Sequence, residues 1–189
     1  YNAGWYATGS YNTFVGSDAG KGGTTSAPYS SGEYNVSLGY QALSGFTTGY
    51  NNVAVGGNAG DAINTGYNNT IMGKSAGTNI TTGHSNVIIG RVAAYASTDV
   101  DKAVIIGEQA GYTGNMTSDA DGTVSIGAGA GKNITSGRYN VSVGFGALAS
   151  EDDGDGNTAI GYSALTAQTG TSGIVGNTVV GYQAGTSIT

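Results

Sequence analysis

The stretch YNVSVGFGAL at residues 139–148 decides the fold, because variants of it recur along the whole chain. Related phrases are YNVSLGYQAL at 34–43, GNTAIGYSAL at 156–165 and GNTVVGYQAG at 176–185. Aligned on the glycine that closes each short apolar run, ten copies begin at Asn12, Asn35, Asn52, Asn69, Asn86, Ala103, Thr123, Asn140, Asn157 and Asn177. Six of the nine intervals give a 17-residue period, and the other three are longer by three or six. A repeat of this period indicates stacked structural units.

Three positions of the repeat hardly vary. When each copy is numbered from its first residue, position 1 is Asn in eight copies, and position 5 is Gly and position 8 is Ala in all ten. These columns include Asn52, Gly56, Ala59, Asn69, Gly73, Ala76, Asn140, Gly144 and Ala147. Glycine permits a turn that a Cβ atom would obstruct, and alanine lets the next pass of the chain pack closely. We expect the Asn side chains to form a ladder, each amide bonded to a neighbouring rung.

Each repeat predicts one short strand, rich in β-branched residues and followed by turns. A 17-residue unit has no room for a packed helix and cannot bury its own apolar side chains, so neighbouring units must stack. We therefore predict an all-β fold, a parallel β-solenoid of about ten 17-residue rungs that forms a single domain over residues 1–189. At the usual spacing of parallel strands, the rod would be roughly 50 Å long. The longer intervals predict side loops at 21–31, 112–121 and 166–175.

The strand positions also predict which side chains are buried, because successive side chains alternate between the two faces of a strand. Position 4 is always aliphatic or Met, so we expect positions 2 and 4 to face the interior and position 3 to face solvent. Position 3 carries an apolar residue larger than alanine at Phe14, Ile71, Ile88, Ile105 and Val179. An exposed apolar stripe usually marks an interface. The sequence therefore predicts parallel self-association of the chain through this stripe.

The composition excludes several classes of protein. Thirty-six glycines without a three-residue period, and with a single proline, do not make a collagen. No cysteine is present, so disulfides and thiolate metal sites are absent. A net charge of −6 argues against nucleic acid and anionic membranes as partners. No apolar run approaches the roughly 18–20 residues that span a bilayer.

No residue is predicted to be catalytic, and the chain is expected not to be an enzyme. GAGAGK at 127–132 and MGKS at 72–75 both fail the G-x-x-x-x-G-K-[ST] pattern of phosphate-binding loops. The only histidine, His84, has no strained nucleophile motif beside it and is predicted to be a solvated turn residue. A polysaccharide-cleaving solenoid usually carries a carboxylate cluster in a cleft, whereas the acids here are scattered through turns.

The acidic run EDDGDGN at 151–157 is the candidate metal site. Asp153, Asp155 and Asn157 have the D-x-D-x-N spacing that begins a calcium loop. No glutamate follows at the closing position, so a solvated acidic turn is the alternative. No cofactor other than this calcium ion is predicted.

Six N-x-[ST] sequons raise the possibility of glycosylation. Asn35 and Asn140 belong to the predicted ladder and are expected to be unavailable. The sequons predicted to lie in turns, and hence to be available, are Asn79, Asn115 and Asn133.

Tyrosine recurs at the turns. One corner is predicted to carry Tyr11, Tyr34, Tyr50, Tyr67 and Tyr139, and another Tyr40, Tyr162 and Tyr182. Stacked rings along a corner would cover and rigidify it, and the alternative is that they bind sugars.

The repeat resembles the head repeats of trimeric autotransporter adhesins and is similar to repeats in phage tail fibres. The matching stretches are NNVAVGGNAG at 51–60, GTVSIGAGAG at 122–131 and GNTAIGYSAL at 156–165. The resemblance covers nearly the whole chain. It implies a left-handed β-roll that forms a homotrimer, projects from a cell surface or virion into the extracellular space, and attaches to something there.

These observations leave three functions open. The first is a non-enzymatic structural fibre module for surface attachment, of the adhesin-head or tail-fibre type, with a surface polysaccharide or a host-cell receptor as partner. The second is a repeating subunit of an extracellular helical filament that stacks end to end, since the terminal rungs lack obvious polar caps. The third is an ice-binding solenoid, which would require regular Thr-x-Thr pairs on one flat face.

Overall fold

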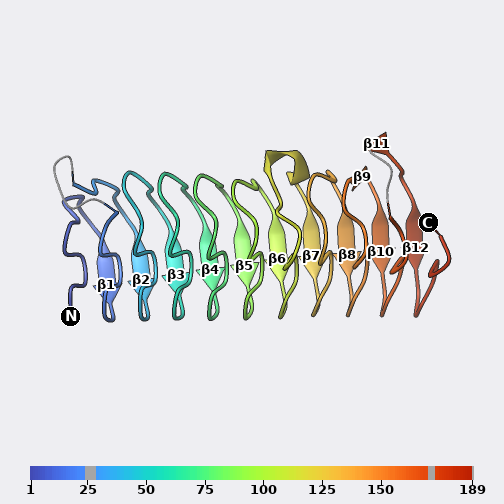
Figure 1. Ribbon diagram of the computed structural model, residues 1–189, viewed down its shortest axis with the longest axis horizontal. Coiled ribbons are helices and arrows are strands. Elements are labelled where there is room, and N and C mark those ends of the chain that lie inside the picture. Colours follow the sequence, from blue (N-terminus) through green and yellow to red (C-terminus); the bar gives the residue numbers. More distant parts are fainter. Residues whose placement is uncertain (24–28, 170–172, 189) are drawn as a thin grey trace.

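The computed structural model describes residues 1–23, 29–169 and 173–188, and it shows a row of stacked rungs along one axis (Figure 1). The predicted all-β parallel β-solenoid is confirmed, because ten parallel strands form one sheet in the order β1-β2-β3-β4-β5-β6-β7-β8-β10-β12. The strands of this sheet are β1 (Thr13–Val15), β2 (Val36–Leu38), β3 (Val53–Val55), β4 (Thr70–Met72), β5 (Val87–Ile89), β6 (Val104–Ile106), β7 (Val124–Ile126), β8 (Val141–Val143), β10 (Thr158–Ile160) and β12 (Thr178–Val180).

The sheet is in register from end to end. Val53 pairs with Thr70, and Thr70 pairs with Val87, so equivalent positions of the repeat form straight columns. The interval between β6 and β7 is longer than the basic period, yet Val104 still pairs with Val124. The extra residues are taken up in the turn, which contains the 3-10 helix η1 (Ser118–Ala120). A small second sheet pairs β9 (Gly154–Asp155) with β11 (Gly173–Ile174).

Two of the three predicted side loops thus contain secondary structure of their own. The loop 112–121 holds η1, and the loop 166–175 includes β11, which lies beside β9 of the preceding rung. The described part of loop 21–31 includes Ser30, which forms an isolated parallel bridge with Ala7. Residues 24–28 and 170–172 of these loops lie outside the described residues.

The faces of the strands are the reverse of those predicted. The middle residue of each strand, at position 3, points into the rod, and Ile71, Ile88 and Ile105 are fully buried. Phe14 and Val179 pack partly buried against the same core. The predicted self-association stripe at Phe14, Ile71, Ile88, Ile105 and Val179 is therefore wrong. These residues are an interior column of the single chain, and positions 2 and 4 face outward.

The Asn column explains the reversal. Asn52, Asn69 and Asn86 at position 1 are buried, and position 3 shares their face because a strand alternates with a period of two. The interior is narrow, which suits the Ser and Ala residues that occupy position 3 in other rungs. The constant aliphatic character of position 4 therefore belongs to the outside of the sheet, and it does not mark the core of the single chain.

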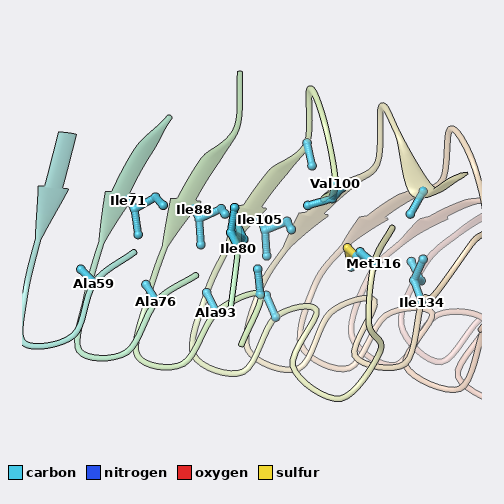
Figure 2. Packing of buried hydrophobic residues seen from close by; sticks show 14 of the residues in the cluster. Ala59, Ile71, Ala76, Ile80, Ile88, Ala93, Val100, Ile105, Met116 and Ile134 are labelled. Carbon is cyan, nitrogen blue, oxygen red and sulfur yellow. The ribbon is translucent and has the colours of Figure 1, made fainter. Parts of the chain in front are cut away.

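Positions 3 and 9 of the repeat share the space inside the rod, so that a large residue at one position is met by a small residue at the other. Figure 2 shows Ile71, Ile88 and Ile105 pointing into the interior, which the Ala59–Ala76–Ala93 column also lines. Where position 3 is large, position 9 is small: a Cβ atom on Gly77 would lie 3.1 Å from Ile71 Cδ1. In three rungs where position 3 is small, position 9 is leucine, in the pairs Ser37 with Leu43, Ser142 with Leu148 and Ala159 with Leu165. Such complementarity keeps the interior densely packed.

The opposite orientation of neighbouring isoleucines can be tested by matched substitutions. We expect Ile88→Thr to lower the free energy of unfolding by about 2–3 kcal/mol, because it removes a buried methyl group and buries a hydroxyl. The neighbouring change Ile89→Thr should lower it by about 1 kcal/mol at most, because threonine already occupies outward positions such as Thr70 and Thr158. Urea unfolding followed by circular dichroism measures both values at a protein concentration where the chain is not assembled, because self-association through outward side chains would add to the loss at Ile89. Equal losses at the two positions would contradict this orientation.

The asparagine ladder joins consecutive rungs on the inner side of the sheet. Asn69 Oδ1 accepts hydrogen bonds from the backbone N–H and the Nδ2 of Asn86, at 3.1 and 3.0 Å. Asn69 Nδ2 donates to Asn52 Oδ1 at 3.0 Å and to the carbonyl of Gly83 at 2.8 Å. Each amide therefore links its strand both to the neighbouring rung and to the return turn. Position 1 of the next rung is Ala103, which has no side-chain amide. Its backbone N–H still donates to Asn86 Oδ1 at 2.9 Å, so the connection between rungs continues there.

Candidate functional sites

The outward side chains of the ten-stranded sheet form one continuous apolar surface. Positions 2 and 4 of the ten strands contribute two side chains each, of which sixteen are Val, Ile, Leu or Met and four are Thr. We call this surface the outer sheet face. It carries no charged residue. Its most exposed apolar members are Val180, Val15, Leu38, Met72, Val36 and Ile160.

The outer sheet face is as large as the largest apolar patches found on single chains, about 300–600 Å². Ten strands at a spacing of about 4.8 Å and a width of about 10 Å give on the order of 500 Å². Contiguous apolar patches of this size on a single chain usually mark interaction sites. Exposure is highest toward the ends of the sheet, where Val15 is 54% exposed, Leu38 49% and Val180 67%. The outward side chains of β3 and of β5 to β8 are half-buried by one another.

One corner of the rod carries a column that begins with aromatic rings and continues with charged groups. The rings of Tyr50 and Tyr67 stack with centroids 5.0 Å apart, and those of Tyr67 and His84 with centroids 4.6 Å apart. His84 Nδ1 lies 2.6 Å from Asp101 Oδ1, which also accepts the backbone N–H of His84 at 2.7 Å. His84 is therefore held between two rungs and is not the solvated turn residue that we predicted.

The tyrosines predicted for that corner occupy two columns. Tyr11 and Tyr34 stack with centroids 4.8 Å apart, one position after the column of Tyr50 and Tyr67. Both have positive φ angles, of 61° and 57°, a conformation that few residues adopt without strain. Asn51 and Asn68 occupy the same column with φ angles of 55° and 56°. The column is therefore defined by its backbone, and the aromatic rings cover a turn that other residues can also make.

A second aromatic column, at position 6, adjoins a cavity. The rings of Phe145 and Tyr162 lie 5.3 Å apart with an angle of 9° between their planes, and those of Tyr162 and Tyr182 lie 5.2 Å apart at 14°. In the rung before Phe145 the same position is Ala128. A cavity of about 420 Å³ opens there, lined by Glu108, Gln109, Ala128, Gly129, Lys132 and Phe145 among others. Sequence reasoning missed it, although the change from Glu108 to Ala128 to Phe145 at one position of three consecutive repeats is a signal.

The acidic turn gathers different carboxylates from those predicted. One side-chain oxygen each of Glu151, Asp152 and Asp153 lies within 4.8 Å of the others. Glu151 is buried, and its Oε1 accepts the backbone N–H groups of Asp152 at 3.0 Å and Gly154 at 2.7 Å. Desolvation, and to a lesser degree the adjacent Asp152, raises the pKa of Asp153.

The other two predicted calcium ligands are engaged elsewhere. Asp155 Oδ1 accepts the backbone N–H of Arg138 at 2.7 Å. Asn157 is buried in the ladder, where its Oδ1 accepts the backbone N–H of Asn177 at 3.1 Å. The converging set therefore shares only Asp153 with the predicted set, and calcium binding stays a prediction.

The three predicted glycosylation sites lie between strands, as predicted. Asn79 and Asn115 are exposed, and Asn133 is half-buried. Asn79 Nδ2 donates to the carbonyl of Tyr95 at 2.8 Å, whereas Asn115 and Asn133 accept from Thr98 and Thr113. A sugar would be attached to the amide nitrogen, so it would leave the bonds accepted by Asn115 and Asn133 in place and would crowd an inter-rung donor only at Asn79. Glycosylation stays a prediction.

Comparisons with models of known protein families, with curated proteins and with solved structures find no match to this chain. Within residues 1–23, 29–169 and 173–188, no helix is long and apolar enough to span a bilayer. The class of protein is therefore defined by the fold alone. The chain is a repeat protein, a parallel β-solenoid with a 17-residue period that is compatible with a β-roll repeat.

Proposed function

We propose that the chain is a non-enzymatic structural fibre module that acts outside the cell in surface attachment, of the adhesin-head or tail-fibre kind, and that its rods associate as a parallel homotrimer. The observation that carries this proposal is the outer sheet face, an uncharged apolar strip that runs the length of the sheet. A ligand-binding enzyme would present its chemistry in a localised cleft. Here the dominant surface feature is as long as the sheet itself, which favours an assembly role.

The occupant proposed for the outer sheet face is the same face of other copies. In-register columns of Val and Ile repeat every rung, so a second copy set at the same height meets an identical surface along its whole length. Closed cyclic symmetry is the usual form of such association, because every copy then buries the same patch. Three rods around one axis would remove all of their outer sheet faces from water while their turns and side loops stay exposed.

The rod itself supports a mechanical role. The ladder and the in-register sheet make each rung bond to both neighbours along the axis. Repeat proteins of this kind draw their stability from such nearest-neighbour contacts. A stiff spacer with variable turns is suited to presenting recognition surfaces at a distance from its base.

The assembled state of the chain tests the proposal. We expect light scattering to give a discrete species of three chains, and negative-stain images to show short rods. The double variant Ile89→Asp and Ile106→Asp should yield folded single chains, because it places two carboxylates in the centre of the outer sheet face. The matched control is Thr65→Asp with Thr82→Asp, which changes two exposed return-turn residues in neighbouring rungs and should leave the trimer intact.

Two outcomes would overturn the trimer. A stable single chain at all concentrations would show that the outer sheet face tolerates water. Long fibres with a regular axial repeat would favour the alternative of a filament subunit stacked end to end. In that case the Asp pair on the outer sheet face should leave fibre formation unchanged.

A further inference from the structure

The Phe145–Tyr162–Tyr182 column has an uncovered ring face at each end, one on Tyr182 and one on Phe145, and that of Phe145 adjoins the cavity. The three rings come from the same position of consecutive rungs, and their planes are nearly parallel, so the stack runs along the rod. Tyr162 is covered on both sides. On the side of Phe145 that faces away from Tyr162, the next rung supplies only Ala128. Phe145 is 58% exposed and forms one wall of the cavity over Ala128.

The cavity has the size and the open floor that a ring-shaped ligand needs. Its volume of about 420 Å³ lies in the range of roughly 300–1,000 Å³ that small-molecule sites occupy. The floor is formed by Ala128 and Gly129, and no atom lies within 4 Å of the place where a Cβ on Gly129 would be. A ring placed there would continue the stack by one more step.

Polar side chains line the rest of the cavity that Phe145 walls on one side. Glu108 lines the cavity and forms an ion pair with Arg91. Gln109 adds an amide that both donates and accepts hydrogen bonds. Lys132 adds an ammonium group, and among the described residues it takes part in no salt bridge. The cavity thus combines one apolar wall with donors and acceptors.

We propose that this cavity binds one pyranose ring of an oligosaccharide, stacked on Phe145 and hydrogen-bonded to Glu108, Gln109 and Lys132. A pyranose has an apolar face of C–H groups and a rim of hydroxyl groups that both donate and accept, which matches this arrangement. A purely aromatic ligand could stack on Phe145 but would make no hydrogen bonds to the three polar side chains of the cavity. The inference rests on the proposed attachment function and names the chemical class to which the module attaches.

Three single-residue variants separate this site from the rest of the stack. Ala128→Tyr fills the cavity with the ring that the column lacks and should fold, because it repeats the stacking of Phe145 on Tyr162. Phe145→Ala removes the wall. Tyr182→Ala is the matched control, because it removes an exposed ring from the far end of the same stack and leaves the cavity lining unchanged.

The measurement is an NMR titration of the whole chain with cellobiose, maltose, lactose and methyl glucuronide, which separates neutral from acidic pyranoses. We expect at least one sugar to bind, and its affinity to fall by about tenfold or more in Ala128→Tyr and Phe145→Ala but not in Tyr182→Ala. The proposal is overturned if none of the sugars binds, or if Ala128→Tyr binds as well as the wild type. Benzyl alcohol is titrated as an aromatic probe, and its binding in the absence of any sugar binding would overturn the proposal in favour of an aromatic ligand.

The assembled mass of each sample keeps the two proposals apart. A trimer that fails to bind sugar would overturn the site and leave the fibre module standing. A single chain that binds sugar at Ala128 would overturn the trimer and keep the site. Because the cavity lies at positions 6, 7 and 10 of the repeat, and not at positions 2 and 4, its variants should not alter assembly.

Discussion

Asn69→Asp is expected to lower the free energy of unfolding by about 3–5 kcal/mol at neutral pH, because it places an unpaired charge in the buried ladder. The new oxygen would replace the Nδ2 that donates to Gly83 O and Asn52 Oδ1, so three oxygens would face one another. Asn69 is 1% exposed, and water cannot relieve this repulsion. Urea unfolding at a fixed protein concentration measures the loss.

The neighbouring residue provides the control for this change. Asn68→Asp alters the same functional group one residue earlier, but Asn68 is exposed and only its Oδ1 is used, as acceptor from Asn51 Nδ2 at 3.1 Å. We expect a loss of less than about 1 kcal/mol. Burial also favours the neutral form of the new carboxyl at position 69, so its folded state binds a proton more tightly than its unfolded state. The gap to wild type should therefore shrink as pH falls, and a gap that widens would contradict the ladder.

Gly56→Ala is expected to cost at least about 3 kcal/mol, from a strained backbone and a clash that nothing flexible can relieve. Gly56 has a φ of +132°, and a Cβ atom there would lie 2.6 Å from the carbonyl oxygen of Gly73 and 2.7 Å from its carbon. Both contacts are to the backbone of the next rung. Because the rungs are in register, any shift that relieves the clash must break the hydrogen bonds between β3 and β4.

Gly57→Ala is the control one residue further on. A Cβ atom at Gly57 would meet only the carbonyl oxygen of Tyr40 at 4.0 Å, and the φ of Gly57 is not in the left-handed region. This variant should be within about 0.5 kcal/mol of wild type, or slightly more stable because alanine restricts the unfolded chain. Thermal unfolding of both variants decides the matter. Equal losses at Gly56 and Gly57 would mean that the column of position 5 does not make the close approach between rungs.

The proposed trimer and the proposed sugar site use different parts of the same repeat. The outer sheet face needs positions 2 and 4 to stay apolar in every rung, whereas the cavity arises where position 6 changes from a large residue to Ala128. A position that keeps the same kind of residue in every rung forms a continuous surface for assembly. A position at which one rung differs from its neighbours forms a local site. The same logic applies to Glu151, which replaces the buried isoleucine of neighbouring rungs such as Ile134 and turns a core position into a polar one.

The repeat alone was sufficient to predict the architecture. A 17-residue period with Asn, Gly and Ala in fixed places leaves a parallel stack as the way for short units to bury apolar side chains. The ladder at Asn52, Asn69 and Asn86 follows from the same period, because a buried amide must find partners and only the neighbouring rung offers them in every copy.

Only the tertiary structure decided which face of the strand is inside. Alternation shows that positions 2 and 4 share a face, but both faces carry apolar residues, so hydropathy cannot tell a core column such as Ile71, Ile88 and Ile105 from an assembly surface. The cavity over Ala128 and the contact of His84 with Asp101 also depend on side chains from adjacent rungs, which meet only after the chain has made a full turn of the solenoid. Both features are contacts between residues about 17 positions apart in the sequence, so they form only when the rungs lie side by side.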